Sequence, residues 1–140
     1  MIPKNSLWPE DIGSTPDPRS PNTILREQAA ALAPLTQRKI LAIVVAGSQG
    51  EWVTLDFTLV APGLNDYHYR LFKVRHKVHP QYPAQILWDK NLRAENENEL
   101  RQHLASIFRD RTTQRVLGDL MTLSVPSEEH EESAGEPELP

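Results

Sequence analysis

The chain contains no cysteine among its 140 residues. It can therefore form neither a disulfide framework nor a cysteine-ligated zinc or iron–sulfur site, and it has no thiol nucleophile. Aromatic residues make up only 6% of the chain, and no run of about 18 apolar residues is present that could cross a membrane. The segment MIPKNSLWPEDIG also lacks the apolar core of a signal peptide. These absences predict a cytoplasmic protein with no membrane-embedded part.

The negative charge of the chain comes from its C-terminal end. The 15 Lys and Arg residues and 19 Asp and Glu residues give a formal net charge of −4. Residues 126–140 contain six Glu but neither Lys nor Arg, so the rest of the chain carries a formal charge of +2. A segment of this composition cannot bury enough apolar surface to fold. We therefore expect residues 126–140 to form an acidic, disordered tail.

The N-terminal end is rich in proline. Five prolines lie within the first 21 residues, and each of them fixes φ and removes a backbone donor. We expect residues 1–19 to form an extended arm, which leaves residues 20–125 as a single domain. Trp8 is the large apolar side chain of this arm, and we expect its ring to dock on the domain. The alternative is that Trp8 anchors a binding partner.

Three segments of the domain have the periodicity of amphipathic helices. Ser20 or Asn22 can cap the first, which has Pro21 in its first turn and ends near Pro34. Asn96, followed three residues later by a glutamate, begins the second helix. Its apolar stripe consists of Leu100, Leu104, Ile107 and Phe108. The third helix has a stripe of Val116, Leu117, Leu120 and Met121.

Four segments are typical of strands. Residues 39–46 are so continuously apolar that we expect this strand to be covered on both faces. Residues 47–50 (GSQG) predict a hairpin turn, and alternation over 52–60 predicts a second strand. Alternation over 67–78 predicts a third strand, with the side chains of Tyr69, Leu71, Lys73, Arg75 and Lys77 on one face. Residues 84–88 predict a short fourth strand.

The order of these elements predicts an α+β fold. We expect one helix, a four-stranded antiparallel meander sheet and two C-terminal helices, with the helices packed on one face of the sheet.

A Tyr-Pro pair, Tyr82-Pro83, leads into the predicted fourth strand. With this pair, the order of elements over residues 20–123 resembles the ubiquitin-conjugating-enzyme and RWD superfamily. In that family the Tyr-Pro segment packs the loop before the fourth strand against the sheet. The family's enzymes use a cysteine near a His-Pro-Asn tripeptide, whereas this chain has no cysteine and its tripeptide His79-Pro80-Gln81 precedes Tyr82. The resemblance therefore implies a binding module and not a thioester enzyme.

No catalytic constellation is present in the sequence. Ser48 lies in AGSQG, which follows a strand into a hairpin and does not match the Gly-x-Ser-x-Gly pattern. The same glycines lack the Gly-Lys-Ser/Thr ending of a phosphate-binding loop. The glutamates within residues 95–99 lie at a helix start, where the helix dipole favours negative charge. We therefore predict a protein that is not an enzyme and that carries no cofactor.

The histidines do not have the spacing of metal ligands. His76 and His79 lie three residues apart, but alternation in a strand would direct them to opposite faces. We predict no metal site. We expect His76 to be a hydrogen-bonded, partly buried ring, and His68 and His103 to be surface rings.

One surface feature remains, a row of cationic side chains next to tyrosines on the third strand. Basic residues interleaved with aromatic ones can bind a nucleic acid, but a charge of +2 outside the tail argues against it. Lysines can also protect a strand edge from association. The candidate partner-binding residues, with the Tyr-Pro pair included, are Tyr67, Tyr69, Lys73, Arg75, Lys77, Tyr82 and Pro83.

Two function classes follow from this surface. The first is a non-enzymatic interaction module that binds a protein partner through the sheet face or the Tyr-Pro loop. The second is a small immunity or antitoxin-type protein that blocks a partner enzyme by covering a basic active site with an acidic segment such as residues 126–140.

Overall fold

The computed structural model describes residues 5–10 and 19–124. The predicted acidic tail lies outside the described residues, as does most of the predicted N-terminal arm. Within the described residues the chain forms one helix, an antiparallel sheet and two further helices, so the predicted α+β class is confirmed. The sheet has five strands instead of the predicted four.

Helix α1 spans Pro21–Leu35 and begins as predicted. The side chain of Ser20 accepts a hydrogen bond from the backbone N–H of Thr23 (3.2 Å). The helix ends at Thr36, whose buried hydroxyl donates to the carbonyl of Ile40 (3.0 Å). This bond connects the end of α1 to the segment that leads into the sheet.

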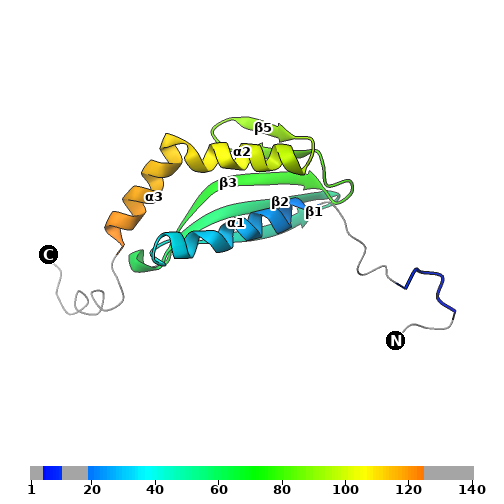
Figure 1. The fold of residues 1–140 in the computed structure, drawn as a ribbon, viewed down its shortest axis with the longest axis horizontal. Coiled ribbons are helices and arrows are strands. Elements are labelled where there is room, and N and C mark those ends of the chain that lie inside the picture. The colour runs from blue at the N-terminus through cyan, green and yellow to red at the C-terminus, as the bar shows by residue number, and fades with distance from the viewer. Residues whose placement is uncertain (1–4, 11–18, 125–140) are drawn as a thin grey trace.

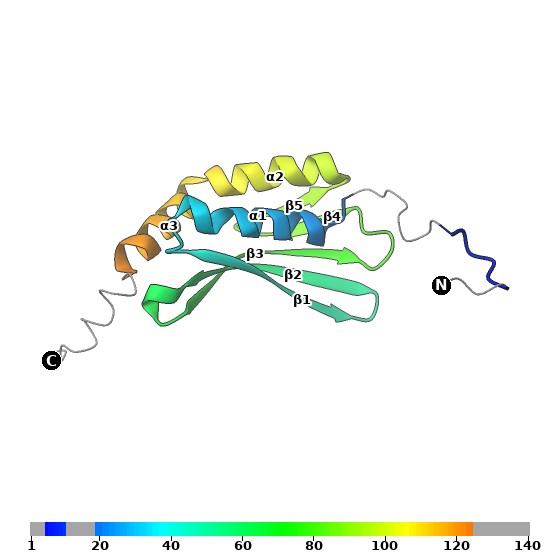
Figure 2. The same ribbon diagram turned by 60° about the horizontal axis from the view of Figure 1, so that its bottom comes forward.

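The sheet is a meander in the order β1-β2-β3-β4-β5, with every neighbouring pair antiparallel. Its strands are β1 (Leu41–Gln49), β2 (Trp52–Ala61), β3 (Tyr67–Lys77), β4 (Ala84–Leu87) and β5 (Asn91–Ala94). A short 3₁₀ helix, η2 (Pro62–Leu64), lies between β2 and β3. Helices α1 and α2 lie over the same face of this sheet (Figures 1 and 2).

The prediction that the first strand is covered on both faces is wrong. Strand β1 is an edge strand that pairs only with β2, and Ile43 and Val45 are 40% and 50% exposed. Val44, between them, is buried in the core. Residues 39–46 form a continuous apolar segment because β1 has apolar side chains on the face covered by the helices and also on the uncovered face. Apolar content alone cannot separate that case from a buried strand.

The first hairpin is also longer than predicted. Strand β1 continues to Gln49, and the reversal is made by Gly50 and Glu51. Gly50 has a φ of 63°, a left-handed conformation that glycine adopts at little cost. Residues 47–49, predicted as part of the turn, therefore extend the ladder with β2.

A bulge in β3 changes which side chains share a face. Phe57 lies opposite Phe72, whereas Thr58 lies opposite Arg70, so Leu71 is an extra residue on β3. The alternation predicted across the whole strand is therefore wrong for Tyr69 and Leu71. Both side chains lie on the face covered by the helices instead of beside the cationic row.

Helix α2 (Glu97–Arg109) begins as predicted, because the side chain of Asn96 accepts from the backbone N–H of Glu99 (2.9 Å). Helix α3 (Arg111–Leu123) follows after the single residue Asp110. The carboxylate of Asp110 accepts from the backbone N–H of Thr112 (2.9 Å) and so caps α3.

Three phenylalanine rings connect α2 to the sheet. The rings of Phe57 and Phe72 stack with centroids 5.0 Å apart, and the ring of Phe108 lies tilted 5.5 Å from Phe57 and 6.1 Å from Phe72. Leu104 and Ile107 of α2 are buried beside them, so the predicted apolar stripe of this helix faces the core.

The expectation that Trp8 docks on the domain is wrong. Its side chain is 71% exposed, and Figure 1 shows residues 5–10 well apart from the sheet and helices. Its backbone N–H bonds locally to the hydroxyl of Ser6 (3.2 Å). The core cluster is made by residues between Ile24 and Leu120, and Trp8 is not a member of it. The alternative that Trp8 anchors a partner stays a hypothesis.

The phenylalanine cluster makes a stability prediction. We expect Phe72→Ala to lower the free energy of unfolding by about 3–5 kcal/mol, because a buried ring is lost and a cavity remains. Leu123→Ala, which truncates an exposed side chain near the end of α3, should change it by less than about 0.5 kcal/mol. Urea unfolding of both variants measures these differences, and similar losses in the two would contradict the assigned core.

Candidate protein-binding face

The sheet leaves one of its faces uncovered by helices. Partners in an antiparallel register point to the same face, so the side chain of Lys73 lies beside that of Asp56, and the side chain of Lys77 beside that of Trp52. Their neighbours Phe72 and Val74 are buried toward the helices. The open face, as we define it, is formed by Ile43, Val45, Trp52, Asp56, Arg70, Lys73, Arg75, Lys77 and Gln85.

Arg75 is held in place at the centre of the open face. Its guanidinium carbon lies 3.7 Å from the ring centroid of Trp52, and its Nη1 donates to Oε1 of Gln85 (3.2 Å). The ammonium of Lys77 lies 5.7 Å from the same ring. A cation over an aromatic face at an exposed site contributes about 0.5–1 kcal/mol. Arg75 thus bridges from β2 to β4 and is more ordered than a free surface arginine.

The open face is electropositive. On β2 and β3, within the described part of the chain, it carries the cations Arg70, Lys73, Arg75 and Lys77 and one carboxylate, Asp56. Oδ2 of Asp56 lies 4.0 Å from Nη1 of Arg70, and Oδ1 lies 4.0 Å from Nζ of Lys73. Oδ1 of Asp56 is buried and has no hydrogen-bond partner among the described residues, so Arg70 and Lys73 are the groups that offset the charge of this carboxylate.

The cationic row does not protect a strand edge. Strand β3 lies between β2 and β4, and β4 pairs with it at Lys73, Val74 and Arg75, so the centre of the cationic row is not at a free edge. The edge strands are β1 and β5, and β1 carries the exposed aliphatic side chains Ile43 and Val45 on the open face. The open face thus combines a central cationic row with an apolar border.

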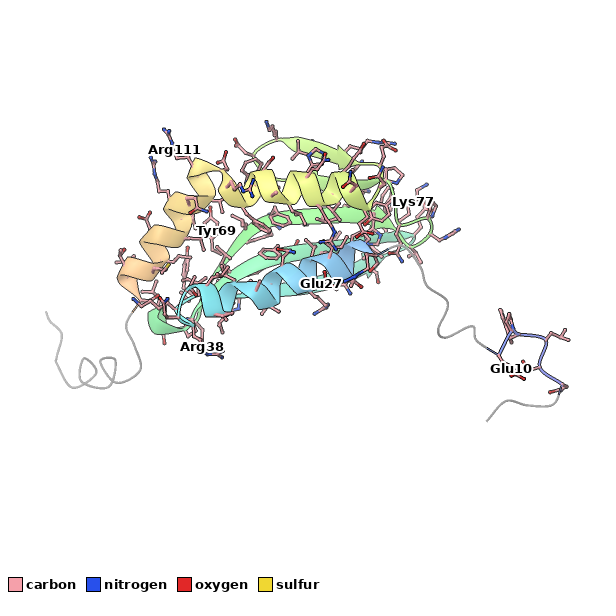
Figure 3. All side chains as sticks on the ribbon, in the orientation of Figure 1. Glu10, Glu27, Arg38, Tyr69, Lys77 and Arg111 are labelled. Atoms are coloured by element: carbon pink, nitrogen blue, oxygen red, sulfur yellow. The ribbon has the colours of Figure 1, made fainter. Side chains whose placement is uncertain are left out.

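The tyrosines predicted to flank this row lie on the other face. Tyr69 pairs with Leu59 and Tyr67 pairs with Ala61, and both partners are buried in the core. Figure 3 labels Tyr69 and Lys77 toward opposite ends of β3. The bulge at Leu71 is the cause, since it reverses the alternation between the two halves of the strand.

The Tyr-Pro pair contributes to a different region. The hydroxyl of Tyr82 donates to the backbone carbonyl of Arg19 (2.9 Å), just before α1, while Pro83 is exposed ahead of β4. Burial, and secondarily the carboxylate of Glu97, raises the pKa of Tyr82 to about 12, although Arg101 lowers it. Tyr82 therefore positions the start of α1 and is not part of the open face.

An ion-pair network surrounds this hydroxyl. Arg101 of α2 pairs with Glu97 (3.0 Å) one turn earlier and with Glu27 of α1 (3.5 Å). Arg19 also pairs with Glu27, and its backbone N–H donates to Glu97 (3.4 Å). The network links the first two turns of α1 and α2 beside the hydrogen bond of Tyr82.

Tyr82 gives the stability a pH dependence. Because folding raises the pKa of this phenol from 10.0 to about 12, the folded chain keeps a proton that the unfolded chain releases. The stabilisation from this phenol is fully present below pH 10.0, the unfolded pKa, and is lost as the pH rises through about 12, the folded pKa. We expect Tyr82→Phe to lower the free energy of unfolding by about 1 kcal/mol near neutral pH, because the variant lacks the hydrogen bond of the hydroxyl. Between neutral and alkaline pH, the free energy of unfolding should fall less in this variant than in the wild type.

Urea unfolding at about pH 8 and about pH 11 tests this expectation. Tyr67→Phe, which removes the hydroxyl of a half-exposed ring, is the matched control. The same alkaline loss in Tyr82→Phe and in the wild type would contradict the role of this phenol.

The histidines occupy structural positions. His76 is buried, and its Nδ1 lies 2.7 Å from the carbonyl of Lys77, so the ring is hydrogen-bonded as expected and more buried than expected. His103, expected at the surface, is half-buried, with Nε2 2.9 Å from the carbonyl of Arg93. Among residues 5–10 and 19–124 no group of three or more potential ligands could hold a metal ion.

The sequence pattern did not reveal Trp52, Ile43 or Val45 as members of the site. Comparison with known protein families, with curated proteins and with solved structures finds no match. In the part of the chain that the structure describes, no helix is long and apolar enough to cross a membrane.

Proposed function

We propose that this chain is a non-enzymatic protein-interaction module that binds an acidic partner protein on the open face. The observation that carries this proposal is the combination of four cations, one carboxylate and two exposed aliphatic side chains that β1, β2 and β3 place on one sheet surface. Charge complementarity accelerates association and selects the partner, while burial of the aliphatic border supplies affinity.

The chemistry of the open face favours a protein over a nucleic acid. A single-stranded nucleic acid would need a free aromatic ring on which a base can stack. The ring of Trp52 is already covered by Arg75. The exposed side chains of Ile43 and Val45 would also gain nothing beside a phosphate backbone, whereas they suit the apolar residues of a protein surface.

The edge of β1 adds a second element of recognition. Its outward backbone groups have no strand beside them within the described residues, and an extended segment of a partner can pair with such an edge. A partner strand placed there would lie next to Ile43 and Val45. Its carboxylates would then need to reach across β1 and β2 toward Arg70 and Lys73.

The relationship to the ubiquitin-conjugating-enzyme and RWD superfamily is part of the same proposal. It is supported by the order of one helix, an antiparallel meander and two C-terminal helices. The chain has no cysteine, so a role within such a fold would be binding and not thioester transfer. The immunity-type alternative relies on residues 126–140, and the described open face, being basic, gives it no support.

A charge reversal tests the open face. We expect Lys73→Glu combined with Lys77→Glu to leave the chain folded and to lower its stability by about 1 kcal/mol, because the new carboxylate at position 73 lies opposite Asp56. Arg75 is left in place to preserve its contact with Trp52. In a pull-down from the native cell extract, this double variant should lose proteins that the wild type captures in a salt-sensitive manner.

The matched control is Arg111→Glu combined with Arg115→Glu on exposed positions of α3, which changes the net charge by the same amount. Capture should survive in this control, and Ile43→Asp should abolish it. Equal loss in both double variants, equal retention in both, or an absence of salt-sensitive capture by the wild type would overturn the proposal.

The non-enzymatic part has its own test. With an activating enzyme, ATP and a ubiquitin-like protein, we expect no covalent adduct, because the chain has no thiol that could accept a thioester. Mass spectrometry of the reaction is the measurement. An oxyester or isopeptide product traced to one residue of this chain would contradict a purely binding role.

A further inference from the structure

A second site lies on the helix-covered side of the sheet. An apolar pocket with a volume of about 450 Å³ opens between the second half of α1 and α3. We call it the α1–α3 pocket. Its apolar lining comes from five elements, α1, β2, β3, α2 and α3, and includes Leu32, Phe57, Leu59, Leu71, Phe108 and Leu117. Small-molecule sites in proteins have volumes of about 300–1,000 Å³ and mostly apolar linings.

No charged side chain lines this pocket within the described part of the chain. The polar members of the lining are Gln28, Thr36, Thr113 and Gln114. The hydroxyl of Thr36 is bonded to Ile40, and the amide of Gln114 donates to the carbonyl of Phe108 (2.6 Å). A charged ligand would lose its hydration here without gaining a counter-ion, so the pocket selects against it.

The hydroxyl of Thr113 is the unsatisfied polar group of this pocket. Thr113 is 1% exposed, and its Oγ1 has no hydrogen-bond partner among the described residues. The residue lies in the first turn of α3, where no carbonyl of its own helix precedes it by four residues. Because an unpaired buried hydroxyl is costly, a native structure that retains one requires an explanation.

Gly118 is a second feature without an internal explanation. It lies exposed in the middle of α3 and lines the pocket. A Cβ atom placed there would meet no heavy atom within 4 Å, so close packing inside this chain does not require glycine. Glycine is unfavourable within a helix compared with alanine. Its lack of a side chain leaves the pocket accessible beside α3.

We propose that the α1–α3 pocket binds a neutral, mostly apolar small molecule with one hydrogen-bonding group that pairs with the hydroxyl of Thr113. A protein docked over the opening would leave that hydroxyl unpaired, since Thr113 is buried beneath the surface. A small molecule fits both the uncharged lining and the volume. This site lies on the opposite side of the sheet from the open face and does not depend on the function proposed for that face.

Two related dyes test the proposal on the full chain. N-phenyl-1-naphthylamine is neutral and has one N–H group, and 8-anilinonaphthalene-1-sulfonate has the same ring system with an added charge. We expect saturable fluorescence enhancement with the neutral dye at one site per chain, and binding of the sulfonate that is at least about tenfold weaker. Equal affinity for both dyes would overturn the neutral-ligand assignment.

Variants locate the binding. Gly118→Leu should weaken binding of the neutral dye by at least about tenfold, because the new side chain closes the opening. Asp119→Leu, which adds the same side chain to an exposed neighbour outside the lining, should bind like the wild type. Unchanged binding in Gly118→Leu, or equal loss in the two variants, would place the dye elsewhere and refute the proposal.

The hydroxyl has a separate test. Thr113→Val should weaken dye binding by about tenfold and leave the unfolding midpoint equal or higher, because it removes an unpaired buried hydroxyl. Thr113→Ser should retain binding. Sedimentation without dye should show a monomer, and a dimer that the dye dissociates would identify a second copy of the chain as the occupant and overturn the proposal.

Discussion

The extra residue Leu71 in β3 determines which side chains reach each face of the sheet. Because of this bulge, the consecutive residues Leu71 and Phe72 both face the helices. The chain can therefore place Tyr69 on the helix face and still direct Lys73 outward. Without the extra residue, strict alternation would direct either Phe72 or Leu71 to the open face. The chain would then lose either the stacked ring in the core or a wall of the α1–α3 pocket. The core, the open face and the pocket all depend on this one irregularity.

The second constraint is that the helices cover only one face of the sheet. A sheet covered on one side buries a single core, here centred on the stacked rings of Phe57 and Phe72. The other face must be compatible with water or with a partner. In this chain the open face is partly apolar at the β1 edge and cationic at β3, and that combination supports the proposed binding role.

The sequence predicted those features whose causes are local. The cap at Asn96 and the apolar stripe of α2 involve residues within one or two turns of each other, and both were predicted correctly. The position of β1 at the edge and the bulge at Leu71 depend on pairing between distant segments, which a periodic pattern does not encode. Strand β5 has only four residues, too few to show a period. Trp52 could have been suspected, because it lies opposite Lys77 in the hairpin of β2 and β3.

The two surfaces make opposite use of charge, although they share the same two strands. On β2, Asp56 faces the open side while its neighbour Phe57 lines the pocket, and Thr58 and Leu59 repeat this alternation. Charged groups are favoured on the open side, where water stabilises them and where the carboxylates of the proposed partner would do the same. In the pocket a charge would be desolvated without a counter-ion. Alternation along β2 therefore places adjacent residues on a surface that favours charge and in a pocket that disfavours it. An acidic ligand suited to the open face would not enter the pocket, and a neutral apolar ligand suited to the pocket would gain little from the cations of the open face.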